Sequence, residues 1–573
     1  MRRWLPGVLV LLVAGCSLPL PSGVRTAEGL PVEQQRSGEV MQVLPPGPKP
    51  GQTPKEVVQG FLQAQANADD AHAIARSFLT PALAQSWDDT AGVQVYLSAS
   101  QTATSLPEGG ASDARVQVSA HVTGVIAADG AYSPRAATST ETYSLTRSQG
   151  EWRLSVVPAG LRLTPADQDR SLRASIVYYV GVPDATGGPH LVPDRVYLPS
   201  TGSPATRLVR RLLQSPSSVL AGSVADEPGL RATSVSVDGA GVVSIDLAGA
   251  AALPPSARED LSARLVWTLR GLGSAFRGLR LQSDGKPLTV TGQGPVQDAG
   301  AWDAYDPEGL GVNPPYFYVA GRRLRASPQL QLPSTTATAG EPGHRPAVGV
   351  DAVAVTPDRT QVALLDGTGP GLVTVRTGPL RGPTYRIAVQ AVGLTSPSYG
   401  TGDRGLWLVR RKAHVSLLAV GQTRLRDVPV SGQPAGALTR LAVSRDGARI
   451  ALVIERGLYV GRIEYVGRTE EAADRLRITG LQAVAPGYQI SDVAWESGTE
   501  LVVVGSSGPA QASLARVAID GSVVEPLNIA AQVPEHLTAC SAGIVFSEGS
   551  TLFAYTGRRP ENLGTGDRPA YPG

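Results

Sequence analysis

Cys16 has the most specific chemical context of any residue in this chain. It ends the run Val13-Ala14-Gly15-Cys16, which follows a basic head, Arg2 and Arg3, and a short apolar stretch. This order is typical of a removable export signal, since a helix that spans a bilayer needs roughly 20 apolar residues. A thiol at the cleavage point can accept diacylglycerol. We therefore expect residues 1–15 to be a lipoprotein signal peptide; the alternative is a plain secretory signal in which Cys16 has no role.

Lipidation at Cys16 would place the mature chain on the outer face of the cytoplasmic membrane. The thiol would carry S-diacylglycerol and the new amino terminus an N-acyl chain such as palmitate, and two or three chains suffice for stable anchoring. The other cysteine, Cys540, would then have no partner for an intramolecular disulfide. It lies among small residues, Thr538 to Ala542, so we expect a small buried apolar side chain.

No other group of residues predicts a catalytic, metal or cofactor site. The HExxH and GxSxG patterns are absent, no cysteine pair could bind zinc, and the histidines are far apart in the sequence. They are His72, His121, His190, His344, His414 and His536. His190 and Asp194 could form half of a catalytic pair, but no nucleophile has a matching context. We therefore predict no enzyme activity and treat His190 as a solvated loop residue.

Two further patterns have a structural explanation that we prefer to a functional one. Gly400 to Gly405 matches GxGxxG, yet the strand-like Leu406–Val409 follows it where a dinucleotide site needs a helix, so we predict a turn. Four aspartates invite a calcium or catalytic interpretation, but aspartates in propeller turns usually make local hydrogen bonds. They are Asp358, Asp366, Asp446 and Asp492.

The net charge argues against nucleic acid as a partner. The 573 residues carry a formal charge of +2, and binding to nucleic acid needs a basic face that displaces counterions. After Cys16 no apolar stretch approaches the length of a membrane span. The hydrophobic content of 42% is that of a globular protein, and the length suits several domains.

The chain divides into a tether and three folded parts. Residues 16–52 are rich in proline and predict a tether behind the lipidated cysteine. Residues 53–160 begin with a capping box at Thr53 and Glu56, continue with a second helix over 69–78, and end in alternating strands. Helices followed by a curved antiparallel sheet suggest an α+β domain like nuclear transport factor 2 (NTF2-like).

Residues 170–295 predict a second α+β domain. Strands over Ala174–Val180 and Leu191–Tyr197 precede a helix that Ser203 caps, and a hairpin turns at Asp238 to Gly241. A capping box at Ser256 to Glu259 should open a further helix. The order resembles a GerMN domain, named for spore germination proteins, and such domains are interaction modules.

Residues 312–557 carry a repeated pattern of apolar strand, polar turn and apolar strand. Val353 to Leu365 and Leu441 to Ile454 are the clearest copies, and others start near Gly393, Val493 and Gly543. The spacing is close to the ~40 to 50 residues of a propeller blade. We expect a C-terminal β-propeller of five blades, or six if Tyr316–Ala320 completes the last. Residues 558–573 are glycine, proline and charge, and predict a disordered tail.

This order of parts resembles the LpqB family of actinobacterial lipoproteins over nearly the whole chain. The most specific matches are Val57–Leu62, Glu151–Leu154, Pro158–Leu161, Leu191–Arg195 and Leu265–Leu269. The resemblance implies a binding or regulatory accessory to the extracellular part of a sensor histidine kinase, in two-component signalling that controls cell-envelope and division genes. The alternative is an extracytoplasmic envelope enzyme or ligand-binding protein that acts on cell-wall glycan or peptide. The first interpretation has membrane lipid and the kinase as partners. Neither interpretation needs a cofactor.

Overall fold

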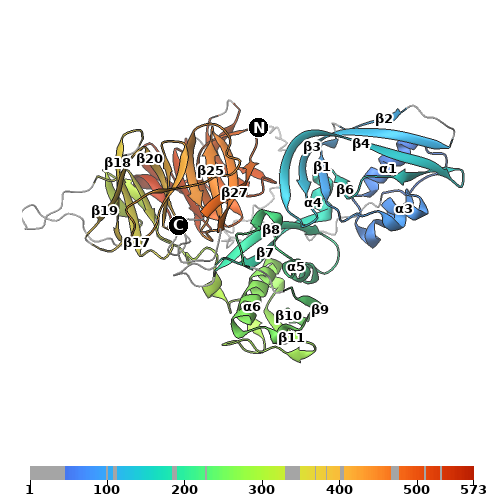
Figure 1. Cartoon of the computed structure of the whole chain (residues 1–573), viewed down its shortest axis with the longest axis horizontal. Coiled ribbons are helices and arrows are strands. Elements are labelled where there is room, and N and C mark those ends of the chain that lie inside the picture. Colours follow the sequence, from blue (N-terminus) through green and yellow to red (C-terminus); the bar gives the residue numbers. More distant parts are fainter. Residues whose placement is uncertain are drawn as a thin grey trace, which may run out of the picture. The chain divides into compact units, whose positions relative to one another are not determined.

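A computed structural model describes residues 45–573 apart from eleven short internal gaps (Figure 1). The gaps are 99–100, 107–111, 183–189, 226–228, 329–348, 368, 383, 401–404, 466–475, 509–510 and 530–531. The predicted signal peptide, Cys16 and most of the predicted tether lie outside the described residues.

The first domain begins with the predicted capped helix. Helix α1 (Pro54–Ala64) starts after Thr53, whose side chain accepts from the backbone N–H of Glu56 while the Glu56 side chain accepts from the backbone of Thr53, so the capping box is confirmed. The single helix expected over 69–78 is instead a 3₁₀ turn, η2 (Asp69–His72), followed by α2 (Ala73–Ser77). The left-handed φ of Asp70, Ala71 and His72 separates the two. Helix α3 (Pro81–Ser86) follows.

A curved six-stranded sheet packs against these helices. Its order is β5-β4-β3-β1-β6 with β2 beside β3, and only β1 and β6 run parallel. The strands are β1 (Val93–Tyr96), β2 (Thr102–Leu106), β3 (Asp113–Ile126), β4 (Tyr132–Ser148), β5 (Glu151–Val156) and β6 (Leu161–Leu163). Phe61 of α1 packs edge-on against Trp87 and Tyr143, which places the core between α1 and the sheet.

The middle domain joins a hairpin, two main helices and a second sheet. Its helices are α4 (Pro165–Ser171), α5 (Pro204–Leu212) and α6 (Pro255–Leu269); the 3₁₀ turns are η4 (Ser218–Leu220), η5 (Ala250–Ala252), η6 (Arg270–Ala275) and η7 (Asp303–Tyr305). The hairpin is β7 (Leu172–Val180) with β8 (Leu191–Pro199). The sheet contains β9 (Arg231–Val237), β10 (Val242–Ala248), β11 (Gly278–Ser283), β12 (Lys286–Pro287) and β13 (Gln297–Asp298).

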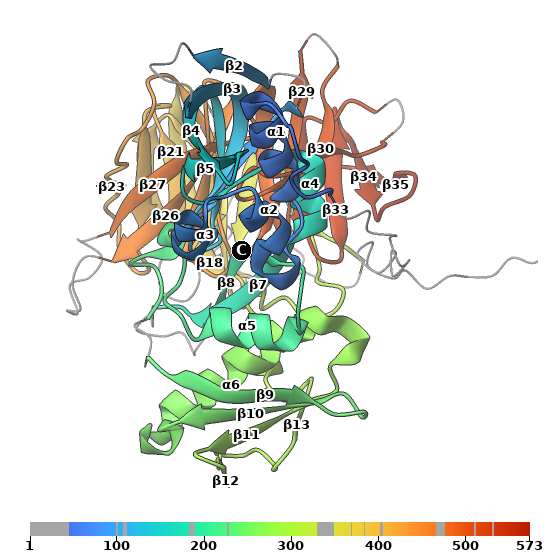
Figure 2. The ribbon, with the colours of Figure 1, turned by 90° about the vertical axis from the view of Figure 1, so that its right-hand side faces the viewer.

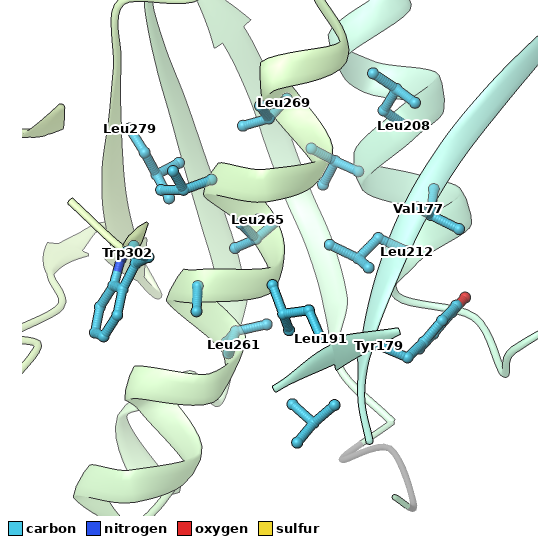
Figure 3. Close-up of a cluster of buried hydrophobic side chains, with 14 of the residues drawn as sticks. Val177, Tyr179, Leu191, Leu208, Leu212, Leu261, Leu265, Leu269, Leu279 and Trp302 are labelled. Carbon is cyan, nitrogen blue, oxygen red and sulfur yellow. The ribbon is translucent and has the colours of Figure 1, made fainter. Parts of the chain in front are cut away.

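The cap of α5 follows the sequence, whereas the cap of α6 does not. Ser203 accepts from the N–H of Thr206, as predicted. Helix α6 begins one residue before the predicted capping box, at Pro255, and Pro254 at its N-cap offers no side-chain bond. Proline suits a first helical position because it has no N–H to leave unsatisfied. Figures 2 and 3 show α5 and α6 beside the sheet, with leucines such as Leu212, Leu265 and Leu279 in the shared core.

The C-terminal part consists of successive four-stranded antiparallel sheets. The first is β16 (Ala352–Val355), β17 (Gln361–Asp366), β18 (Leu372–Pro379) and β19 (Arg386–Val392). The second is β20 (Leu394–Tyr399), β21 (Leu406–Arg410), β22 (His414–Leu418) and β23 (Arg426–Val428). The third is β24 (Leu438–Val443), β25 (Arg449–Ile454), β26 (Gly457–Tyr465) and β27 (Leu476–Val484). The fourth is β28 (Tyr488–Ser497), β29 (Glu500–Ser507), β30 (Ser513–Ala518) and β31 (Val524–Pro526). The fifth is β32 (His536–Cys540), β33 (Gly543–Glu548), β34 (Thr551–Tyr555) and β35 (Glu561–Thr565).

The segment 558–573 is not a disordered tail. It contains β35 and β36 (Asp567–Ala570), and β36 pairs with β14 (Phe317–Ala320), which also pairs with β15 (Arg323–Ala326). Tyr571 is buried and its backbone N–H donates to Thr538 Oγ1. The prediction failed because local composition does not show that the strand has a partner about 250 residues earlier in the chain.

Candidate functional site

Strand β8 contains Leu191-Val192-Pro193-Asp194-Arg195 and joins the middle domain to the propeller. Leu191 and Val192 lie in the core of the middle domain. Pro193 packs against Gly498 of the propeller so closely that a Cβ at Gly498 would lie 2.5 Å from the proline ring, and its carbonyl accepts from Nη2 of Arg449. This motif therefore packs β8 against the propeller, a role that its sequence does not indicate.

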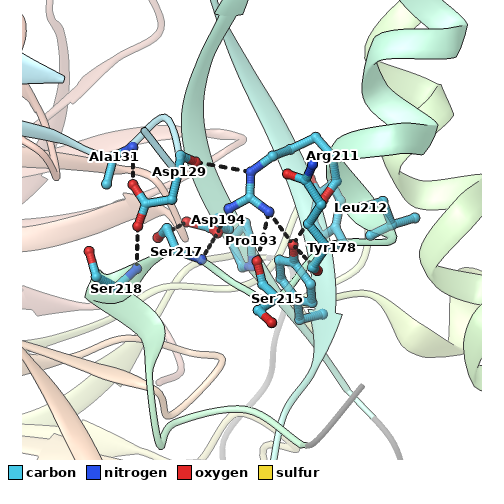
Figure 4. Close-up of polar contacts among 12 residues, drawn as sticks. Asp129, Ala131, Tyr178, Pro193, Asp194, Arg211, Leu212, Ser215, Ser217 and Ser218 are labelled. Carbon is cyan, nitrogen blue, oxygen red and sulfur yellow. Dashed lines mark hydrogen bonds and ion pairs between the residues drawn. The ribbon is translucent and has the colours of Figure 1, made fainter. Parts of the chain in front are cut away.

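Asp194 forms the centre of a buried polar network (Figure 4). Its Oδ1 accepts from Ser217 Oγ at 2.7 Å, and its Oδ2 accepts from the Ser217 backbone N–H at 2.8 Å and from Arg211 Nη2 at 3.4 Å. Burial raises the pKa of Asp194, while the Ser217 bonds and Arg211 oppose the shift. The carboxylate that we considered and set aside as a catalytic partner of His190 is thus bonded to Arg211 and Ser217 and has no exposed surface.

Arg211 extends this network to the first domain. Its Nε donates to the Asp129 carbonyl at 3.0 Å, and its Nη1 donates to Tyr179 Oη and to the Ser215 carbonyl. The Asp129 carboxylate accepts from the backbone N–H of Ser218 at 2.9 Å. Although burial alone would raise the pKa of Asp129, the backbone donors of Ser218 and Ala131 hold it below its usual value.

Further contacts connect the middle domain with the propeller and with the first domain. Arg195 Nε lies 3.2 Å from Asp520 Oδ2, and Arg462 Nη1 donates to the Ser218 carbonyl at 3.1 Å. The rings of Tyr132 and Tyr197 lie 5.9 Å apart. Residues 45–573 accordingly form one compact unit. We call the contacts centred on Pro193, Asp194, Arg195, Arg211 and Ser217 the three-domain joint.

The propeller contains a cavity of about 300 Å³. The first strands of all five four-stranded sheets line it, together with β36. Half of the lining residues are alanines, valines, serines and threonines from these six strands. Its charged lining residues are Arg440, Arg445, Asp492 and Arg568, with His536 beside them.

Asp492 is the one carboxylate that the described wall of this cavity contains. Its Oδ1 lies 3.1 Å from Arg440 Nε, and its Oδ2 accepts from the Leu537 N–H at 3.1 Å and lies 3.6 Å from His536 Nδ1. Burial alone would raise the pKa of Asp492, but Arg440, His536 and the Leu537 N–H together lower it. Asp492 is therefore an anion in the cavity wall. We had expected only a turn residue that makes local hydrogen bonds.

Arg445 is a buried part of the cavity wall. Its guanidinium donates to the carbonyls of Pro572, Trp495 and Ala539 and lies 3.1 Å from Glu308 Oε2. Burial raises the pKa of Glu308, and Arg445 opposes the shift. Every nitrogen of this guanidinium has an acceptor, so Arg445 has a structural role in the wall.

Two of the other three aspartates make the expected local contacts. Asp358 accepts from Thr356 Oγ1 and from the Thr360 N–H. Asp446 accepts from Ser444 Oγ and the Ala448 N–H, and also pairs with Arg449. Asp366 differs, since its partners are Arg322 and Arg376. Within the described residues no group of three or more His, Cys, Asp or Glu side chains could hold a metal ion.

The remaining predicted residues have simple positions. Gly400 and Gly405 flank a connection between antiparallel strands β20 and β21, which confirms the strand that argued against a dinucleotide site; residues 401–404 lie in a gap of the description. Cys540 is free and fully buried, as predicted, and burial raises the pKa of its thiol. Cys16 lies outside the described residues.

The first domain also has a pocket, but one of only about 20 Å³. Glu141 and Arg162 form a bidentate pair in its wall, and Tyr143 Oη donates to Glu141. The Glu141 carboxylate is paired with Arg162, and the pocket has about the volume of one water molecule. It therefore leaves no room for a substrate.

Three family models match successive parts of the chain. They are the N-terminal domain of lipoprotein LpqB over residues 47–169, a sporulation and spore germination domain over 176–289, and the β-propeller domain of lipoprotein LpqB over 331–561. The middle model agrees with the expected GerMN domain, and the last with the expected propeller.

Relatives named lipoprotein LpqB match most of the chain. Lipoprotein LpqB of Cutibacterium acnes is 26% identical over 92% of this chain and 88% of its own length, and that of Thermobifida fusca is 28% identical over 90% and 88%. Among solved structures, TolB from Acinetobacter baumannii has a TM-score of 0.32 and 12% identity, covering 45% of this chain and 66% of its own. No helix in the described parts of the chain is long and apolar enough to cross a bilayer. The order of the three models and the long relatives together show that the chain belongs to the LpqB family of actinobacterial lipoproteins.

Proposed function

We propose that the mature protein is anchored by lipid at Cys16 on the extracytoplasmic face of the cell membrane and acts there as a non-catalytic binding and regulatory accessory. The observation that carries the proposal is the three-domain joint. Its buried contacts hold three modules as one unit, so an anchored chain presents its propeller in a fixed relation to the other two domains. Such a scaffold suits docking to a membrane partner, because anchoring raises the effective concentration of the propeller near that partner.

The partner that we propose is the extracellular domain of a sensor histidine kinase that controls cell-envelope and division genes. Family membership supports this choice of partner. The test is affinity capture of the membrane-anchored protein after mild cross-linking, with identification of the proteins that co-purify. We expect a sensor kinase from the native chain and much less from Cys16→Ala. Recovery of no sensor kinase, together with turnover of wall fragments, would overturn the proposal.

Lipidation has its own test, with a matched control in the second cysteine. Metabolic labelling with an alkyne fatty acid should mark the wild-type chain and Cys540→Ala equally, and should not mark Cys16→Ala. Label that survives in Cys16→Ala would show that the thiol of Cys16 is not the acceptor. Equal kinase capture by a secreted, unlipidated form would refute the role of the anchor in partner binding.

A ligand-binding protein is the second candidate, and the ionisable groups in the propeller cavity favour it. Arg440, Asp492, His536 and Arg568 come together in a space large enough for a small molecule. An envelope enzyme is less well supported. Hydrolysis of a glycan uses two carboxyl groups that face one cavity, and the described wall supplies Asp492 alone.

We also infer six blades for the propeller and an NTF2-like cone for the first domain. Six inner strands around one cavity support the blade number, with β14, β15 and β36 as the sixth blade. The pairing of β36 with β14 would close the ring between the two ends of the domain. For the first domain, helices packed on a long, curved antiparallel sheet support the cone.

A further inference from the structure

The cavity of the propeller has donors that the protein leaves unused. Arg568 lines the cavity, and its Nε lies 3.6 Å from Asp567; its two Nη groups have no acceptor among the described residues. Arg440 uses Nε for Asp492 and Nη1 for the Thr439 carbonyl, which leaves Nη2. His536 has its Nδ1 beside Asp492 and leaves Nε2. The side chains of Arg568, Arg440 and His536 remain 36%, 28% and 19% exposed, so a ligand can reach them.

The carboxylate and two hydroxyls of the same wall already have donors. Asp492 accepts from Arg440 and from two backbone N–H groups, those of Val493 and Leu537. Ser398 accepts from the Val443 N–H and Thr538 from the Tyr571 N–H. A ligand that completes this wall must therefore bring acceptors, and a guanidinium with free Nη groups suits a carboxylate or phosphate oxygen best.

Arg568 adopts an unfavourable backbone conformation at this position. Its φ is +49°, in the left-handed region that is unfavourable for a residue other than glycine. Its backbone N–H donates to the Asp567 side chain, which also accepts from Ser547. These hydrogen bonds hold the backbone conformation of Arg568, whose side chain lies at the cavity wall.

The rest of the wall indicates a peptide with small side chains. Alanines at 352, 354, 442 and 494 leave space beside the main chains of the inner strands. Tyr571 and Gly573 themselves line the cavity, the Pro572 carbonyl between them accepts from Arg445, and the Gly573 N–H donates to the Val355 carbonyl. A short stretch of peptide main chain therefore already packs against this wall.

We propose that the propeller cavity binds the free carboxylate end of a small-residue peptide, with Arg568 as its principal contact and Arg440 and His536 beside it. This inference deepens the ligand-binding candidate and does not depend on the kinase. The carboxylate takes the place of water on the Arg568 guanidinium, and no bond is made or broken.

Calorimetric titration of the full chain in detergent tests the proposal. The probes are N-acetyl-alanyl-alanine, its C-terminal amide, and inorganic phosphate. We expect saturable binding of the free acid with a Kd of about 1 mM or tighter, which is the ordinary efficiency for a ligand of this size. The amide should bind about tenfold more weakly, because it lacks the charge-assisted bonds. Absence of binding by the free acid, equal binding of the amide, or phosphate binding as tight as the acid would each overturn the proposal.

A matched pair of variants locates the site. Arg568→Asn removes the guanidinium with a residue that tolerates positive φ, and should weaken binding of the free acid about tenfold. Arg558→Asn makes the same change at an exposed position outside the cavity wall and should bind as the wild type does. Equal losses in both variants would refute the site.

Two controls keep the result interpretable. Thermal unfolding must show Arg568→Asn folded; if it does not fold, His536→Gln serves instead, with a smaller expected loss because only one donor group beside the principal contact is changed. Kinase capture with Arg568→Asn separates the two proposals. Normal capture with lost titration supports the cavity site alone, whereas normal titration with no kinase in any preparation rejects only the kinase.

Discussion

Arg195 of the middle domain and Asp520 of the propeller form an ion pair with 3.2 Å between Nε and Oδ2, although 325 residues separate them in the sequence. Both side chains are largely buried. The pKa of Arg195 reflects this balance: burial lowers it, and Asp520, Tyr197 and Glu500 together more than compensate, so the net shift is upward. The pair is one of the polar contacts by which β8 ties two domains together.

Arg195→Met should loosen the joint without disturbing the cores. Removal of one partner leaves Asp520 largely buried without its cation, at a cost of roughly 2–4 kcal/mol. Hydrogen exchange at the amides around β8 and Asp520 should speed up by roughly tenfold or more. Arg173→Met on the exposed side of β7 is the control. In a double-mutant cycle with Asp520→Asn, purely additive effects would show that the pair is not coupled.

Asp194→Asn should be among the most damaging changes in the middle domain. The amide cannot accept from both the backbone and the hydroxyl of Ser217 as the carboxylate does, and Arg211 loses its buried counter-ion, at a cost of roughly 3–5 kcal/mol. We expect a lower thermal midpoint and faster proteolysis near the joint. Asp169→Asn, exposed on α4, should leave both measurements unchanged. A folded, fully stable Asp194→Asn chain would contradict the assignment.

Glu464 should make stability fall in acid. Burial opposes ionisation, but bonds from Thr479, Arg462 and Arg477 outweigh it and lower the pKa of Glu464 to about 2, from 4.5 when unfolded. Because the pKa of Glu464 is lower in the folded state, its ionised form stabilises the fold fully above pH 4.5. This contribution is lost as the pH falls toward 2.

Glu464→Gln tests this contribution. The variant should be less stable than the wild type at pH 6, and the difference should shrink by about 1 kcal/mol or more by pH 3, after allowance for solvent screening. Glu561→Gln on the exposed strand β35 is the control. Thermal midpoints across this pH range provide the measurement, and parallel pH curves for wild type and Glu464→Gln would reject the assignment.

Tyr571→Ala should weaken the pairing of β36. The ring is buried, lies 6.2 Å from that of Tyr316, and adjoins Cys540 in a small core. Its loss should cost about 3 kcal/mol and lower the unfolding temperature of the propeller. Leu563→Ala removes an exposed apolar side chain from the neighbouring strand β35 and should have little effect. Equal effects of the two variants would mean that β36 does not stabilise the domain.

Thiol counting should report on both cysteines. Cys540 is fully buried and burial raises the pKa of its thiol, so a maleimide should not modify it in the native chain. In denaturant the mature protein should expose a single thiol, because acylation blocks Cys16. Cys540→Ala should then give none. A second reactive thiol in denatured wild type would show that Cys16 is not acylated.

Much of this protein could be predicted from short stretches of sequence. Thr53 and Glu56 specify a capping box within four residues, and the alternation in β3 predicts a strand with one buried face. The repeated strand–turn–strand pattern predicted the propeller sheets, since each blade is a local unit. The chemistry of Cys16 also rests on its immediate neighbours alone.

The joint and the cavity were decided by tertiary structure. Asp194 suggested a catalytic partner for His190, but its burial and its bonds to Arg211 and Ser217 depend on how α5 and the following loop pack. Arg440, Asp492, His536 and Arg568 each come from a different strand and meet only because those strands surround one cavity. Local sequence determined most of the elements and predicts the lipid anchor, whereas partners distant in sequence determined which polar residues are buried, paired or left open to a ligand.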